Sequence, residues 1–169
     1  MISFGGKNQV VFTNLVRAIE KDSVVELIAS LNEKPEELGS LQEAIPFDSI
    51  DDGRGSYSEM DIPSRGLGPL HVAAFLDSSS CFIYLCENGG DMWMMTVDNY
   101  TPLHYACYSG ALEVATYIIH NSPREYIQEI YNVKYSFIEL AVRSTSFPMV
   151  SALLSGGVLL PTNKEQLSN

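Results

Sequence analysis

The stretch TPLHYA, residues 101–106, decides how this 169-residue chain folds. Threonine is favoured just before a helix, because its side-chain oxygen can accept a hydrogen bond from a free amide of the first turn. Proline suits the first helical position, where its missing N–H group costs nothing. Leu103 and Ala106 are three residues apart, so they lie on one helix face, and the small alanine permits close packing. These residues predict the start of a short, tightly packed helix.

A related stretch, GPLHVA, occupies residues 68–73, which is 33 residues earlier. The similarity extends beyond this motif, since Gly110 follows His104 by six residues and Asp77 follows His71 by six. Glycine readily takes the left-handed conformation of a turn between two antiparallel helices, and aspartate tolerates it better than most residues. The chain therefore contains two consecutive copies of a helix–turn–helix unit.

These copies resemble ankyrin repeats. The ankyrin period is 33 residues, and its helix-opening motif is Thr-Pro-Leu-His-x-Ala. Leu85-Cys86 and Ile118-Ile119 occupy the paired apolar positions of the second helix, and Gly89-Gly90-Asp91-Met92 is similar to the end of a family repeat. The resemblance implies an all-α fold, namely a short ankyrin-repeat solenoid of helix–turn–helix repeats with β-hairpin fingers.

Two weaker copies flank the clear ones. Residues 136–141 align with residues 101–106 after an insertion of two residues, with Glu139 in place of the histidine and Thr145 in place of the glycine. The spacing of apolar residues in 9–31 indicates a further helix pair. Terminal repeats are commonly atypical because their outer face meets water, although the last copy also fits a longer array that was cut. We expect a single ankyrin-repeat domain over residues 1–169 that consists of a degenerate N-terminal capping repeat (9–31), an acidic insertion (32–65), two repeats (66–97 and 98–131) and a degenerate C-terminal capping repeat (132–160).

The formal net charge of −11 is concentrated in one part of the sequence. Residues 32–62 contain nine acidic and two basic residues, a net charge of −7. Such a segment is either a solvated insertion or a docking strip for a basic partner. The acidic residues from Asp48 to Glu59 partly match a calcium-binding EF-hand loop, but Ile50 replaces a ligand and Pro63 would interrupt the following helix. We therefore expect no metal site, and the negative charge disfavours nucleic acid as a partner.

The sequence contains no recognisable catalytic or cofactor-binding motif. The nucleophile motif Gly-x-Ser-x-Gly does not occur, and the short glycine stretches lack the lysine of a phosphate-binding loop. His71 and His104 recur at a position where ankyrin histidines tie the helix start to neighbouring backbone. Three cysteines, Cys81, Cys86 and Cys107, form no metal-binding pair and indicate an intracellular, cytoplasmic location, and no apolar run is long enough to insert into a membrane. We expect a non-catalytic chain without a cofactor.

The resemblance also implies a function, because ankyrin proteins generally bind another protein through the concave helix face and the fingers. Methionine and aromatic residues at those positions are typical of interface cores, although they could instead pack between adjacent fingers or against the acidic insertion. The expected partner-binding residues are Val72, Phe75, Leu76, Met94, Met95, Tyr100, Tyr105 and Tyr108. Two alternatives remain: a regulatory or targeting module that docks a basic partner through the acidic insertion, and the N-terminal ankyrin part of a longer enzyme.

Overall fold

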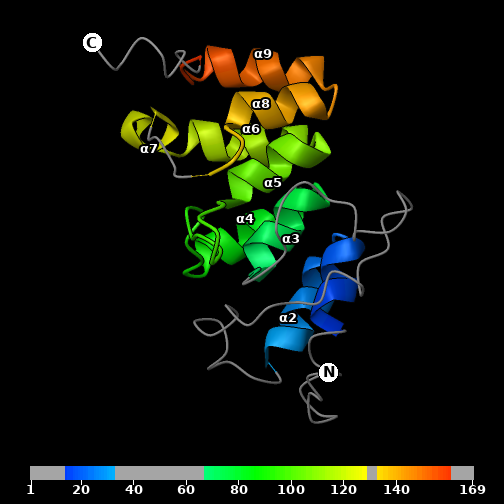
Figure 1. The fold of residues 1–169 in the computed structure, drawn as a ribbon. Coiled ribbons are helices and arrows are strands. Elements are labelled where there is room, and N and C mark those ends of the chain that lie inside the picture. The colour runs from blue at the N-terminus through cyan, green and yellow to red at the C-terminus, as the bar shows by residue number, and fades with distance from the viewer. Residues whose placement is uncertain (1–13, 33–66, 129–132, 161–169) are drawn as a thin grey trace.

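The computed structural model describes residues 14–32, 67–128 and 133–160. The helices in these residues form pairs that stack in one direction, from α2 at the lower end of Figure 1 to α9 at the upper end. Residues 14–20 are helical, and the helices that follow are α2 (Val24–Asn32), α3 (Pro69–Phe75), α4 (Ser79–Glu87), α5 (Pro102–Ser109), α6 (Leu112–His120), α7 (Arg124–Gln128), α8 (Phe137–Arg143) and α9 (Phe147–Ser155). Residues 33–65 of the acidic insertion, with the calcium-loop pattern, lie outside the described residues.

The stacked pairs build two layers of helices. The first helices contact one another from α3 through α5 to α8, and the second helices do so from α2 through α4 and α6 to α9. Within the pairs, α3 packs against α4, α5 against α6 and α8 against α9. The main contacts therefore join each pair to its neighbours along the stack, which is the arrangement of a helical repeat solenoid.

One hydrogen bond recurs in the turn of each of these pairs. The backbone N–H that follows the turn donates to the carbonyl of an alanine five residues earlier, and the donor–acceptor couples are Ser23–Ala18, Ser78–Ala73, Ala111–Ala106 and Ser146–Ala141. The residue just before each donor has a positive φ: Asp22 (50°), Asp77 (55°), Gly110 (77°) and Thr145 (55°). The prediction that Asp77 and Thr145 take the place of Gly110 in the turn is confirmed. Asp22 takes that place in the first pair.

The two turn aspartates also hold consecutive pairs together. Asp22 Oδ1 accepts a hydrogen bond from the Cys81 N–H at 2.8 Å, and Asp77 Oδ1 accepts one from the Val114 N–H at 3.0 Å. Both amides lie in the first turn of the second helix of the following pair. Amides at a helix start have no partner within the helix, so each aspartate caps a helix of the next pair. This capping between pairs was not predicted from the sequence.

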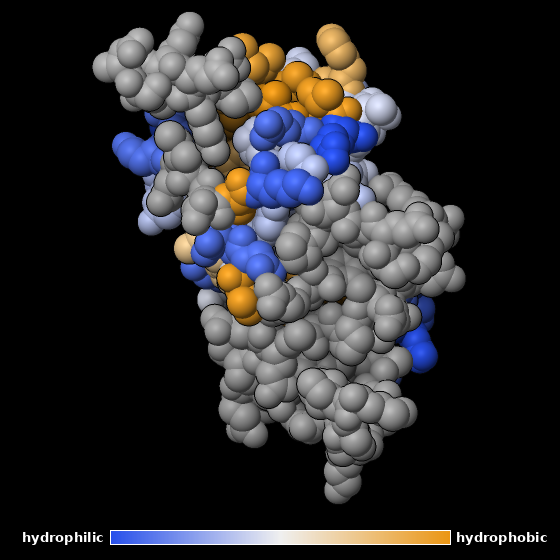
Figure 2. Space-filling view, in the orientation of Figure 1, coloured by the Kyte–Doolittle hydropathy of each residue, from blue (hydrophilic) through white to orange (hydrophobic). Residues whose placement is uncertain are grey.

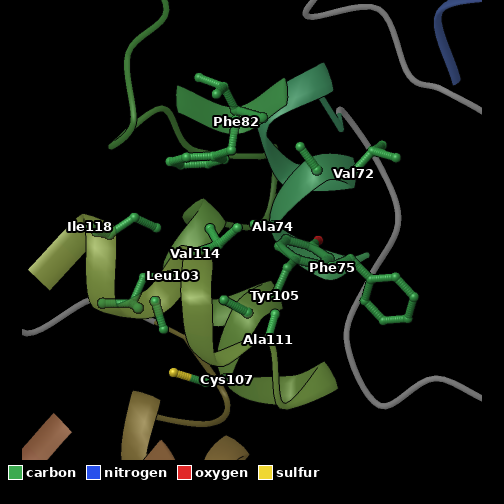
Figure 3. Close-up of a cluster of buried hydrophobic side chains, with 14 of the residues drawn as sticks. Val72, Ala74, Phe75, Phe82, Leu103, Tyr105, Cys107, Ala111, Val114 and Ile118 are labelled. Atoms are coloured by element: carbon green, nitrogen blue, oxygen red, sulfur yellow. The ribbon is translucent and has the colours of Figure 1, made fainter. Parts of the chain in front are cut away.

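The core lies between successive pairs. Figure 3 shows side chains from α3 to α6 meeting between the two central pairs, among them Ala74, Phe82, Leu103 and Val114, and all four are fully buried. The Cys107 side chain points the other way, towards the α8–α9 pair. The α5–α6 pair thus contributes apolar side chains to the interfaces on both of its sides.

The connection between the two central pairs differs from the expected β-hairpin finger. Residues 91–100 form turns, and residues 14–32, 67–128 and 133–160 contain no β-strand. The Met94 N–H donates to the Asp91 carbonyl at 3.1 Å, and the Thr96 N–H donates to the Tyr100 carbonyl at 2.9 Å. These bonds close tight turns, whereas a strand pair requires a ladder of hydrogen bonds between two extended segments.

Candidate functional site

A buried histidine anchors the 91–100 connection to the helix pair before it. His71 Nδ1 accepts a hydrogen bond from the Gly68 N–H at 3.0 Å, and His71 Nε2 lies 3.1 Å from the Met94 carbonyl and 3.2 Å from the Tyr100 carbonyl. Since Nδ1 is the acceptor, the ring proton is on Nε2, which donates to these carbonyls. One imidazole therefore fixes both the start of α3 and the path of the connection.

The equivalent histidine of the next pair fixes its helix start in the same way. The Thr101 N–H donates to His104 Nδ1 at 2.9 Å, and Thr101 Oγ1 lies 2.9 Å from the same nitrogen. Burial lowers the pKa of His71 to about 4 and that of His104 to about 3, so both rings are neutral at physiological pH. The prediction that these histidines tie the helix start to backbone is confirmed. In α8, Glu139 substitutes for the histidine and accepts from the Ser136 N–H at 2.7 Å.

Four of the eight expected partner-binding residues are inside the fold. Val72, Phe75, Tyr100 and Tyr105 are all buried. The Tyr105 ring makes edge contacts with the rings of His71 and Tyr100, at centroid distances of 5.4 Å and 6.3 Å. Burial raises the pKa of Tyr105. The Tyr105 ring therefore packs against Tyr100 of the connection, and the expectation that these four residues line an open concave face is corrected, because all four are buried.

The other four expected residues reach the surface. Leu76, Met94 and Tyr108 are half-buried, and Met95 is 55% exposed. Val97, which was not among the expected residues, lies on the same connection and is 70% exposed. The connection after α4 therefore presents two apolar side chains to solvent, Met95 and Val97, which we call the tip.

A buried threonine holds the tip in one conformation. Thr96 lies between the two tip residues but is only 5% exposed. Its N–H donates to the Tyr100 carbonyl at 2.9 Å, and its Oγ1 accepts a hydrogen bond from the Tyr100 N–H at 3.1 Å. Because Thr96 is fixed inward by two hydrogen bonds to one residue, the side chains before and after it are left at the surface.

An aromatic pair that was not predicted lies on the same connection. The Trp93 indole N–H donates to Ser122 Oγ at 2.8 Å, and the Trp93 and Tyr126 rings are 5.6 Å apart. Tyr126 lies on α7, a five-residue helix in the connection that leads from α6 to α8. The Tyr126 N–H donates to the Pro123 carbonyl at 3.1 Å, and this proline was the available sequence signal for a helix start. The Trp93–Tyr126 contact therefore joins the 91–100 connection to the segment that follows α6.

The chain thus has two stacked helix layers, a recurring turn with a positive φ, and a buried histidine at the helix start. The family described as Ankyrin repeats (3 copies) matches residues 21–130 and, in a second alignment, residues 70–164. The chain belongs to the ankyrin-repeat family. A search of curated proteins finds no significant match.

Ankyrin repeats generally mediate protein–protein interaction. Burial raises the pKa of Cys81 and of Cys86 to about 12, so their thiols stay protonated and are poor nucleophiles. Within the described parts of the chain, no three His, Cys, Asp or Glu side chains come together as a possible metal site. In those same parts, the helices are too short or too polar to cross a membrane.

Proposed function

We propose that this ankyrin stack is a non-catalytic module that binds a partner protein through the tip. The observation that carries this proposal is the contrast along three consecutive residues: Met95 and Val97 are exposed, while Thr96 between them is buried and hydrogen-bonded. Apolar side chains on a fixed backbone bind with a smaller loss of conformational entropy than side chains on a flexible loop.

The surface around the tip has the composition of an interface. Met94, on the same connection, is partly accessible, and the exposed Tyr126 ring lies 5.6 Å from the Trp93 ring, two residues before the tip. Leu76 and Tyr108 are partly accessible at the C-terminal ends of α3 and α5. Methionine and aromatic residues are enriched in interface cores, and methionine adapts to an irregular partner surface. The chemistry that fits this surface is an apolar groove or pocket on the partner protein.

The first part of the test identifies the partner by position. A photo-crosslinking amino acid is placed at Val97 in one protein and at Val25 in another, because Val25 is comparably exposed, at 79%, but lies on α2. Both are incubated in lysate of the source cells. We expect a protein that crosslinks at Val97 and does not crosslink at Val25, and mass spectrometry identifies it.

The second part measures affinity for the identified protein. Met95→Ser with Val97→Ser is expected to weaken binding by about tenfold or more, because truncated hot-spot residues typically cost more than about 1 kcal/mol. Both positions are exposed, so the circular dichroism melting curve should be unchanged. Val25→Ser is the control and should bind as the wild type does. Equal affinity of the tip variant and the wild type would remove the tip from the proposal.

The acidic segment supports a second candidate function. Residues 32–62 carry a net charge of −7, which suits a regulatory or targeting module that docks a basic partner. Under this alternative, binding weakens steeply as salt is raised, and the tip variant binds normally. An apolar contact at the tip would instead be nearly insensitive to salt. Repeating the affinity measurement at low and high salt therefore separates the two candidates.

A further inference from the structure

Exposed apolar side chains gather at the α8–α9 end of the described stack. In Figure 2, several hydrophobic residues gather on the upper part of the face in view, where Figure 1 places α8 and α9. The large exposed apolar residues in this part of the chain are Val142, Phe147, Leu154, Leu159 and Leu160. Monomeric soluble proteins rarely expose a large contiguous apolar patch without a binding role.

The repeat register shows that Val142 occupies an interface position. Counted from the aligned turns, Val142 is equivalent to Cys107 in α5 and to Ala74 in α3. Both equivalents are fully buried, and Figure 3 shows the Cys107 side chain directed towards the following α8–α9 pair. Val142 is 59% exposed because no further helix pair covers it within residues 14–32, 67–128 and 133–160. Its position in the repeat is therefore that of a contact between pairs.

Leu154 leads to the same conclusion from the second helix layer. Its equivalent in α6 is Ile119, which is buried against Gly156 of the following pair. A Cβ atom on Gly156 would overlap Ile119 Cγ2, so the missing side chain of the glycine makes room for the isoleucine. Leu154 has the same position but is 44% exposed. Both helices of the last pair thus carry an exposed apolar side chain at a position where the preceding pair contacts its neighbour.

The charges of this end differ from those of the rest of the chain. The only charged residues in 133–160 are Lys134, Glu139 and Arg143, whereas the whole chain has a net charge of −11. Glu139 is bonded at the start of α8, and Arg143 donates to the Tyr135 hydroxyl at 2.8 Å. A capping repeat would present a polar outer face to water, and the exposed face here is apolar and close to neutral.

We propose that the α8–α9 end binds the α8–α9 end of a second copy of this chain. The contact continues the packing of helix pair on helix pair that the chain already uses between its own repeats. Two near-neutral apolar ends can meet without the repulsion that the total charge would otherwise cause between copies. In the first described helix pair, four of the seven exposed residues are charged, namely Arg17, Glu20, Lys21 and Glu26, and the other three are Val25, Ala29 and Asn32. Head-to-tail stacking would place an apolar end against the pair that carries these charges, whereas like ends form a closed two-fold dimer.

Sedimentation velocity on the full chain, from low to high micromolar concentration, tests this contact. We expect a monomer–dimer equilibrium for the wild type. Val142→Glu with Leu154→Glu should weaken dimerisation by about a hundredfold or more, because unpaired carboxylates would be buried in both copies. Val25→Glu is the matched control, since Val25 is as exposed as these residues but lies on α2, and it should dimerise normally. Circular dichroism confirms that all variants fold.

A crosslinking measurement then locates the interface. Leu154→Cys treated with a bifunctional thiol-reactive crosslinker should give a covalent dimer, because the contact holds both copies of that residue in one interface, whereas Val25→Cys should not. A wild type that stays monomeric at every concentration overturns the proposal. A dimer that survives Val142→Glu with Leu154→Glu, or that Val25→Glu disrupts equally, overturns it as well. The tip takes no part in this contact, so the outcome is independent of the proposed partner binding.

Discussion

At the residue scale, His71 and Asp77 show two kinds of contact that differ in how well the sequence predicts them. The role of His71 follows from its place in a six-residue motif, because its main partner, the Gly68 N–H, is three residues away. Asp77 was assigned to the turn from its tolerance of a positive φ. Its bond to the Val114 N–H joins residues 37 positions apart, so it depends on how two pairs stack. A contact between residues so far apart in the sequence cannot be predicted from the local sequence around either of them.

The two buried histidines should make the fold sensitive to mild acid. Their folded-state pKa values, about 4 for His71 and about 3 for His104, lie below the ordinary 6.5. Their contribution to stability is complete above pH 6.5 and is lost as pH falls towards those values, because only the unfolded state then takes up the protons. Each ring should cost about 1.4 kcal/mol per pH unit below 6.5. Urea unfolding should therefore show roughly 3 kcal/mol less stability at pH 5.5 than at pH 7.5.

The surface histidine provides the control for this measurement. His120 is exposed, so His120→Gln serves as the control for the effect of substituting a surface residue on the unfolding free energy. Asp77 has the opposite sign, because burial raises the pKa of its carboxyl group and the folded state therefore holds that proton more tightly as pH falls. Stability that stays constant between pH 7.5 and 5.5 would show that the two rings are accessible to protons in the folded chain.

At the scale of elements, helix starts and turns were predictable, whereas the connections were not. Helix starts depend on residues a few positions apart, such as Thr101 and Pro102. The 91–100 connection depends on His71 and on Tyr100 carbonyl contacts, and these replace the expected strand pairing. For the same reason, exposure at the surface was predicted correctly for only four of the eight candidate site residues. Register identified the positions of Phe75 and Tyr105, but not the rings that cover them.

Gly156 should be sensitive to the addition of a single methyl group. Its φ of −75° is ordinary for any residue, so Gly156→Ala carries no conformational cost. The new Cβ would collide with Ile119, and overpacking of this kind typically costs about 1–3 kcal/mol. Thermal or urea unfolding of the variant measures this loss of stability.

A double-mutant cycle tests whether the collision is the cause. In an Ile119→Ala background the space beside Gly156 is vacant, so Gly156→Ala should then cost far less than it does in the wild type. An equal cost in both backgrounds would place the strain elsewhere. Gly89→Ala offers a comparison of the other kind, since a Cβ there meets nothing within 4 Å while its φ of 96° disfavours alanine.

At the scale of the whole molecule, stability should be highest in the middle of the stack. The α5–α6 pair contacts a pair on each side, through α3 and α8 in one layer and through α4 and α9 in the other. Opening a terminal pair breaks one interface, whereas opening either of the two central pairs breaks two. Hydrogen exchange should therefore be slowest in α5 and α6 and faster in residues 14–32 and in α9. Slower exchange in α9 than in α5 at low protein concentration would contradict this order.

Trp93 gives this chain an optical reporter at the place where a partner is expected. It is the only tryptophan in the sequence, so emission excited at long wavelength comes from one known position. Its indole N–H donates to Ser122 and its ring packs at a tilt against Tyr126, two residues before the tip begins. A partner that seats on the tip would shield the indole from water and shift its emission to the blue. Unlabelled protein could thus be titrated directly by fluorescence.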